Sequence, residues 1–131
     1  MGEFSNALDV SVSGLKAQSQ RLRHVSENIA NADTPGYRRK TVSFKTEFEG
    51  GRDGVGRVKT GNVGLDQTEL ERIYDPSHPM ADATGNFYGS NVNLIIEVAD
   101  AREAQRSYEA NLKMFDQARQ MSSSLFDLLR R

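Results

Sequence analysis

Apolar residues recur at helical spacing from about Ser5 to Ile29. Repeats of three, four and seven positions place them on one stripe of an α-helix. The stripe consists of Leu8, Val12, Leu15, Leu22, Val25 and Ile29, and small polar serines alternate with it. Ser5 or Asn6 is a suitable N-cap for this helix. So narrow a stripe is typical of packing between helices.

A second stripe of this kind predicts another helix, which begins after Asn91 or Asn93 as a cap. It consists of Leu94, Val98, Ala101, Gln105, Tyr108, Leu112 and Phe115, and continues through Ala118, Ser122, Leu125 and Leu129 after a shift of one residue. In a coiled coil such a shift is a stutter. The two stripes fit a coiled coil and an ordinary two-helix core equally well.

The middle of the chain has a different pattern. Val42, Phe44, Thr46 and Phe48 alternate with other residues, which predicts a half-buried strand. Six of the eleven glycines then fall between Gly50 and Gly64. Shorter apolar clusters around Val63 and Ile73 indicate further strands. We therefore expect a small β-rich insert from Tyr37 to Tyr88, and a fold that is mainly α with this insert.

Three parts follow from these patterns. Residues 1–36 form the N-terminal helix and its exit turn, residues 37–90 the Gly-rich insert and a linker, and residues 91–131 the C-terminal helix. Pro35 cannot continue helical hydrogen bonding, so the first helix is predicted to end between Asn31 and Asp33. Gly36 permits a turn through positive φ.

The charges of the insert are segregated along the sequence. Arg38 to Lys59 contains seven bases and three acids, whereas Asp66 to Asp82 contains five acids and one base. The simpler interpretation is that two oppositely charged strands pair in one sheet. The alternative is that they form complementary faces on neighbouring subunits.

Composition and motifs give little support to an enzyme. The net charge is −1, so nothing overall attracts nucleic acid, and the absence of cysteine excludes thiolate chemistry. His24 and His78 are isolated, and the glycine-rich run lacks the Lys-Ser/Thr end of a P-loop. Glu69, Glu71 and Asp75 offer carboxylates without any sign of a partner. We predict no catalytic residue, cofactor or metal.

Two signatures resemble those of bacterial flagellar rod and hook proteins. The first lies in Ser26 to Tyr37 and consists of Asn28, Ala30, Asn31, Thr34, Pro35, Gly36 and Tyr37. The second consists of Tyr74, Asp75, Pro76, His78, Pro79, Asn91, Val92 and Asn93. The first is general to the family, whereas the second is similar to that of a proximal rod protein within it.

This resemblance implies a structural subunit of the proximal rod of the flagellar basal body, which serves motility. In such proteins the two terminal helices pair as the coiled-coil-like inner layer of a hollow helical tube, and the insert faces outward. The tube transmits torque and conducts exported subunits. The rod crosses the periplasm, and its subunits leave the cytoplasm without a cleaved signal peptide.

The partners that the resemblance implies are copies of the chain, other rod subunits and the flagellar type III export apparatus. Nucleic acid, a small-molecule substrate and a transmembrane segment are not expected. Three other interpretations stay open. They are another proximal rod subunit, a cytosolic coiled-coil adaptor, and a periplasmic glycan-cleaving enzyme that uses Glu71 and Asp75.

Overall fold

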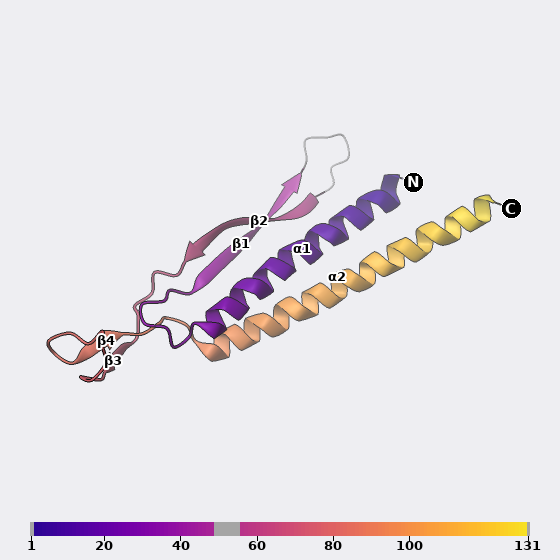
Figure 1. The fold of residues 1–131 in the computed structure, drawn as a ribbon. Helices are drawn as coiled ribbons and strands as arrows, with labels where there is room; N and C mark the ends of the chain where they lie inside the picture. The colour runs from indigo at the N-terminus through magenta and orange to yellow at the C-terminus, as the bar shows by residue number, and fades with distance from the viewer. Residues whose placement is uncertain (1, 49–55, 131) are drawn as a thin grey trace.

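The chain forms two long helices and two small antiparallel sheets (Figure 1). The computed structural model describes residues 2–48 and 56–130. The elements are α1 (Gly2–Ala30), β1 (Lys40–Phe48), β2 (Gly56–Leu65), β3 (Arg72–Tyr74), β4 (Asn86–Tyr88) and α2 (Leu94–Leu129). The prediction of a mainly α fold with a small β-rich insert is confirmed. Glycines 50, 51 and 54 of the predicted glycine-rich run lie outside the described residues.

The two helices lie side by side in opposite directions, with both termini at the same end (Figure 1). Helix α1 begins earlier than predicted and ends at Ala30, just before the predicted range. Asn93 caps α2, because its side chain accepts hydrogen bonds from the N–H groups of Ile95 and Ile96. None of the described helices has the length and apolar character that a membrane crossing requires.

The helices approach closely at Gly14. A Cβ atom at this position would lie 2.8 Å from Nδ2 of Asn111, so only glycine fits without a shift. Counting outward from this contact places Gly2 opposite Ser123, so residues 124–129 of α2 extend beyond α1. The contact therefore fixes how far the two helices overlap.

The strands form two separate pairs. β1 pairs with β2 from Lys40 opposite Leu65 to Phe48 opposite Gly56, with a shift of register between Val42 and Phe44. β3 pairs with β4. The β1–β2 hairpin packs along α1, on the side away from α2, whereas β3 and β4 lie beyond the end of the helix pair (Figure 1).

This topology corrects one prediction about the insert. The strands of the basic stretch pair with each other, and the acidic stretch contains β3, which pairs with β4. Oppositely charged strands therefore do not share a sheet. The two charged stretches fold as separate units because each closes a hairpin with its own sequence neighbour.

A tight turn connects α1 to the hairpin. Gly36 has a φ of +74°, as predicted, in the left-handed region that a side chain disfavours. Its N–H points to the carbonyl oxygens of Tyr88 and Gly89, at 3.1 Å from each. The turn is thus joined to the end of β4, and it fixes the path of the chain out of α1.

The apolar core is small. Among the described residues, the buried hydrophobic side chains are Ala17, Val25 and Ala104. Ser11, Asn28, Ser90 and Glu97 are buried polar residues. The largest fully buried side chains, Glu97 and Asn28, are polar. Most large apolar side chains are therefore left at the surface of the single chain.

Candidate functional site

The predicted leucine stripe of α1 is not the face that α1 buries. The buried residues of α1 are Ser11, Gly14, Ala17, Val25 and Asn28, so Val25 alone belongs to both sets. Leu8, Val12, Leu15 and Leu22 are half-buried, and Ile29 is exposed. Small and polar side chains, rather than leucines, thus allow the close approach of the helices.

Helix α1 has three differently occupied sides. Gly14 faces α2, and Ser13 faces the hairpin, where its Oγ accepts a hydrogen bond from the Val58 N–H at 3.1 Å. The leucines fall on the third side by helical periodicity. Leu15 borders a surface depression together with Tyr108 of α2. Leu15 and Tyr108, one residue from each predicted stripe, therefore lie on the same partly exposed face of the helix pair.

The residues predicted for α2 divide into exposed and half-buried positions. Leu94, Val98, Leu112 and Leu129 are exposed, whereas Ala101, Tyr108, Phe115 and Leu125 are half-buried. The residues from Leu94 to Phe115 form, together with the α1 leucines, the surface that we call the apolar face, whereas Leu125 and Leu129 belong to the part of α2 that extends beyond α1. Contiguous apolar surface of this kind marks a site of interaction.

The first turns of α2 invert the usual order of burial. Glu97 is 0% exposed, while its aliphatic neighbours Leu94, Ile95, Ile96 and Val98 are 45–81% exposed. Burial of a carboxylate is unfavourable without partners, and exposure of four aliphatic side chains is unfavourable in an isolated chain. The first turns of α2 therefore direct a carboxylate into the fold and leave four aliphatic side chains on the surface.

Asn28 is at the centre of the polar contact. Its Nδ2 donates to the Lys40 carbonyl at 3.0 Å and to Oε2 of Glu97 at 3.4 Å. Its Oδ1 accepts from the Lys40 N–H at 2.9 Å and from the Tyr37 hydroxyl at 2.7 Å. The amide uses its full hydrogen-bonding capacity. Burial raises the pKa of Tyr37.

Arg39 supplies the counter-charge for Glu97. Its Nε binds Oε1 of Glu97, and its Nη2 lies 3.0 Å from Oδ2 of Asp100. The other oxygen of Asp100, Oδ1, lies 2.8 Å from Nη2 of Arg21. Burial acts to lower the pKa of Arg39, but the hydrogen bond to Glu97 and the negative charges of Glu97, Asp100 and Asp66 together outweigh it, so the pKa is raised. These ion pairs connect α1, the start of the hairpin and α2.

We call the contacts of Asn28, Arg39, Glu97 and Asp100 the junction. Signature residues Asn91, Asn31 and Thr34, and Ser90 beside them, bond within the linkers around it. Asn91 accepts from the Arg39 N–H at 2.6 Å and donates to the carbonyls of Asp66 and Thr68. Ser90 donates to the Ala32 carbonyl. Asn31 and Thr34 bond to each other at 3.1 Å.

The second signature builds the turn between β3 and β4. Gly85 has a φ of +81°, and a Cβ there would lie 2.8 Å from the ring of Tyr74 and 3.0 Å from Pro76. His78 stacks on Phe87 with ring centroids 3.8 Å apart, and its Nδ1 accepts from the Met80 N–H. Tyr74, Pro76 and His78 therefore have packing roles in this turn.

The remaining positions of this signature have plain surroundings. Val92 is half-buried and Pro79 is exposed, as is Ala30 of the first signature. The carboxylate of Asp75 accepts from the N–H and hydroxyl of Ser77, and Glu71 is exposed. The described residues contain no group of three His, Cys, Asp or Glu side chains able to hold a metal.

Sequence patterns missed three members of the junction, namely Arg39, Glu97 and Asp100. One signal was available, since Glu97 interrupts an otherwise aliphatic run from Leu94 to Val98. An acid in such a run is expected to be exposed unless a cation reaches it. Arg39 is distant in sequence, so the pairing becomes evident only in the fold.

Comparison with known proteins gives matches over both helices. Residues 8–38 match the family described as flagella basal body rod protein. Residues 83–128 match the family described as flagellar basal body rod FlgEFG protein C-terminal.

Curated relatives cover nearly the whole chain. The flagellar basal-body rod protein FlgC of Agrobacterium fabrum is 49% identical, over 99% of this chain and 98% of its own. FlgC of Salmonella typhimurium is 34% identical over 88% of this chain and 90% of its own. FlgC of Borreliella burgdorferi is 31% identical over 98% of this chain and 99% of its own. These relatives are structural rod proteins rather than enzymes.

Proposed function

The chain belongs to the FlgC-type flagellar basal-body rod proteins, and from this premise we propose that it assembles into a hollow helical tube. The family resemblance predicted from both signatures is confirmed, and the chain is a structural protein of the basal-body rod, not an enzyme. In the proposal the tube transmits torque, conducts exported subunits and crosses the periplasm.

The apolar face is the observation that carries this proposal. Leu94, Val98 and Leu112 are 41–51% exposed beside the half-buried Leu15 and Leu22. Burial of such side chains contributes about 1.5–3 kcal/mol each. Neighbouring rod subunits supply that burial in the proposed tube, through contacts that do not close on themselves and therefore generate a helix.

The layers of the fold give the proposed orientation. The hairpin covers one side of α1 and α2 lies on the other (Figure 1), so an outward hairpin leaves α2 innermost. From Arg102 to Gln120, the side of α2 opposite the buried Ala104 carries the exposed polar residues Arg102, Arg106, Lys113 and Gln120. A polar strip of this kind suits the wall of a water-filled channel.

Export through the flagellar type III apparatus, without a cleaved signal peptide, is the corresponding proposal for how the chain reaches the rod. The small core supports it, because a chain with few buried apolar side chains unfolds easily. The lack of cysteine supports it as well, since no disulfide forms before or during passage.

The test is assembly of variants in motile cells. Leu15→Asp and Leu22→Asp each place an unpaired carboxylate in the proposed subunit contact, which is strongly unfavourable. We expect both variants to be secreted normally and the cells to lose motility. The amount of the chain in purified basal bodies should fall at least tenfold, which corresponds to roughly 1.4 kcal/mol or more of binding free energy. Gln120→Asp adds the same charge to the polar strip and is the matched control. Wild-type retention of both leucine variants would contradict the proposal.

A further inference from the structure

The first turns of α2 expose an apolar patch. Leu94, Ile95 and Val98 are 51%, 81% and 45% exposed, and among the described residues Ile95 is the most exposed of the large hydrophobic side chains. Helical periodicity places the three within an arc of about 100° around α2 and places Ile96 outside this arc. We call Leu94, Ile95 and Val98 the start patch.

The last turns of α2 are apolar and exposed as well. Residues 124–129, which extend beyond α1, are called the overhang. Phe126, Leu128 and Leu129 are 51%, 66% and 72% exposed in this segment. A single exposed apolar side chain is ordinary, whereas several together on one short segment mark a contact surface. Both ends of α2 therefore have the character of a contact surface.

The start patch and the overhang do not meet within one chain. Figure 1 shows the start and the end of α2 at opposite ends of the helix pair. At a rise of about 1.5 Å per residue, roughly 40 Å of helix separates Val98 from Phe126. Any contact between the two segments is therefore a contact between two copies.

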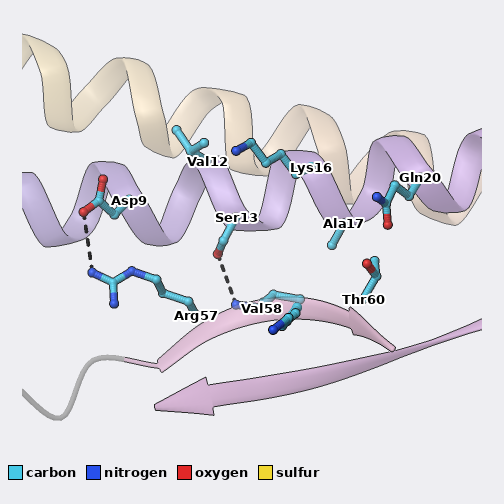
Figure 2. A pocket seen from close by; sticks show the side chains of 10 residues that line it. Asp9, Val12, Ser13, Lys16, Ala17, Gln20, Arg57, Val58 and Thr60 are labelled. Atoms are coloured by element: carbon cyan, nitrogen blue, oxygen red, sulfur yellow. Dashed lines mark hydrogen bonds and ion pairs between the residues drawn. The ribbon is translucent and has the colours of Figure 1, made fainter. Parts of the chain in front are cut away.

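The β1–β2 hairpin is fixed to α1 and leaves both ends of α2 exposed. Figure 2 shows β2 alongside α1, where Ser13 Oγ accepts a hydrogen bond from the Val58 N–H at 3.1 Å. Asp9 pairs with Arg57 at 3.5 Å in the same region. The hairpin is thus held on the side of α1 away from α2, so a cover for the ends of α2 has to come from another chain.

Opposite charges accompany the two segments. Asp127 is the charged residue of the overhang, and Arg102 follows Val98 by about one turn of α2. Both are exposed, and within residues 2–48 and 56–130 neither takes part in a salt bridge. Glu103, the acid beside Arg102, is engaged by Arg21 at 3.3 Å. The two ends of α2 are thus complementary in charge and alike in apolar character.

We propose that the overhang of one copy packs on the start patch of the next copy along the tube. The inference rests on the proposed function and deepens it, because Leu94 and Val98 belong to the apolar face and the overhang is the segment that covers them. A subunit repeated along a helical axis brings its opposite ends together, which is how these two segments are placed. The apolar side chains of the overhang lose their contact with water, and Asp127 lies beside Arg102.

The position of Ile95 gives a further reason for this contact. Helical periodicity places it on the side of α2 that carries the polar strip from Arg102 onward. In the wall of a water-filled channel, so exposed an isoleucine would stay in contact with water, whereas the overhang of the next copy covers it. Since the contact joins two different surfaces of one chain, it is heterologous and continues from copy to copy.

Two neighbouring isoleucines provide a matched test of the start patch. Ile95→Asp places an unpaired carboxylate in the contact, so we expect at least about a tenfold loss of the chain retained in purified basal bodies, relative to secreted protein. Ile96→Asp makes the same change one position later, at a side chain that is 52% exposed outside the patch. Its retention is expected to stay within about twofold of wild type. Equal retention of the two variants, whether high or low, overturns the inference.

Photo-cross-linking identifies the segment that lies on the overhang. Benzoylphenylalanine in place of Phe126 keeps an aromatic ring at this position and reacts with neighbouring C–H bonds on irradiation. In purified basal bodies we expect dimers of the chain in which position 126 of one copy is attached within residues 94–102 of another, as identified by mass spectrometry. The same group in place of Gln120, in the polar strip, is the control and is expected to give no such product.

The cross-linking outcomes separate this contact from the proposed function. Attachment of position 126 to a different rod protein, or to another part of this chain, refutes the contact between the two ends of α2. Absence of the wild-type chain from basal bodies would refute the proposed function itself, whereas its presence without the product at residues 94–102 refutes only the contact.

Discussion

The side chain of Asn28 binds both backbone groups of Lys40, as a neighbouring β-strand would. Nδ2 lies 3.0 Å from the Lys40 carbonyl oxygen, and Oδ1 lies 2.9 Å from the Lys40 nitrogen. A residue near the end of α1 thereby sets the position of the first residue of β1. The hairpin direction and the buried Glu97 both depend on this one amide.

Replacing Asn28 with Ala is expected to release the hairpin from α1. The Lys40 backbone and the Tyr37 hydroxyl lose their partners, at about 1–3 kcal/mol for each group left buried. Faster amide exchange of Lys40 and Val58 is the measurement. Asn31→Ala removes only bonds to Glu27 and Thr34 in the next turn and is the matched control. Equal exchange in both variants would refute this role of Asn28.

The close approach at Gly14 predicts a specific pattern in a double-mutant cycle. Gly14→Ala alone is expected to destabilise the helix pair, because its Cβ would lie within 3 Å of the Asn111 amide. With Asn111→Ala in the background, the same change is expected to stabilise by about 1 kcal/mol, the helix propensity of alanine over glycine. Denaturant unfolding of the four chains measures this. Additive effects would mean that the two residues do not touch.

The exit turn predicts a separation of export from assembly. Pro35→Ala with Gly36→Ala removes the helix stop and places a side chain at φ +74°, which costs about 1–2 kcal/mol. The turn also loses its fixed contact with Tyr88 and Gly89, so the hairpin leaves α1 in another direction. We expect secretion to be normal and incorporation into basal bodies to fail.

The comparison of secreted protein with protein in purified basal bodies measures this effect. Thr34→Ala removes only an exposed hydroxyl contact in the same turn and serves as its control. Normal incorporation of the double variant would contradict the prediction. Loss of secretion would show instead that this stretch acts in export.

The turn around Asp82 is predicted to loosen in acid. Hydrogen bonds from the Thr84 hydroxyl, and then from the Asn86 and Thr84 backbone, lower the pKa of Asp82 below its ordinary value of 3.8. A lowered folded-state pKa means that the stabilisation is complete above pH 3.8 and is lost as the pH falls through the lowered value. The Thr84 and Asn86 amide shifts should follow this titration by NMR. In Asp82→Asn these two amide shifts should not change over the same pH range. If they still do, a group other than Asp82 causes the transition.

The sequence was sufficient for the helices but not for their contact face. Leu8, Leu15 and Leu22 repeat every seven residues, and so do Ser11, Gln18 and Val25. Both sets predict the same helix. Periodicity alone assigns the apolar set to the partner helix, whereas α1 buries Ser11, Gly14, Ala17, Val25 and Asn28 and leaves the leucines partly exposed.

The pairing of strands shows a second limit. Alternation from Val42 to Phe48 correctly predicted β1, and Gly36 correctly predicted the turn. The charges predicted the wrong partner, because opposite charge is compatible with contact within a chain and with contact between chains. Loop closure within each hairpin decided the pairing, and it depends on sequence separation rather than charge.

Hydrogen exchange of the same amides in two states tests the central claim, that neighbouring subunits complete the packing of the helix pair. The claim predicts weak protection of α1 and α2 in dilute, proven monomer, since Ala17, Val25 and Ala104 are the buried hydrophobic side chains of the described chain. In isolated basal bodies the same amides should exchange slowly, with the largest gain around Leu15, Leu22 and Leu112. Strong protection of both helices already in the monomer would contradict the claim.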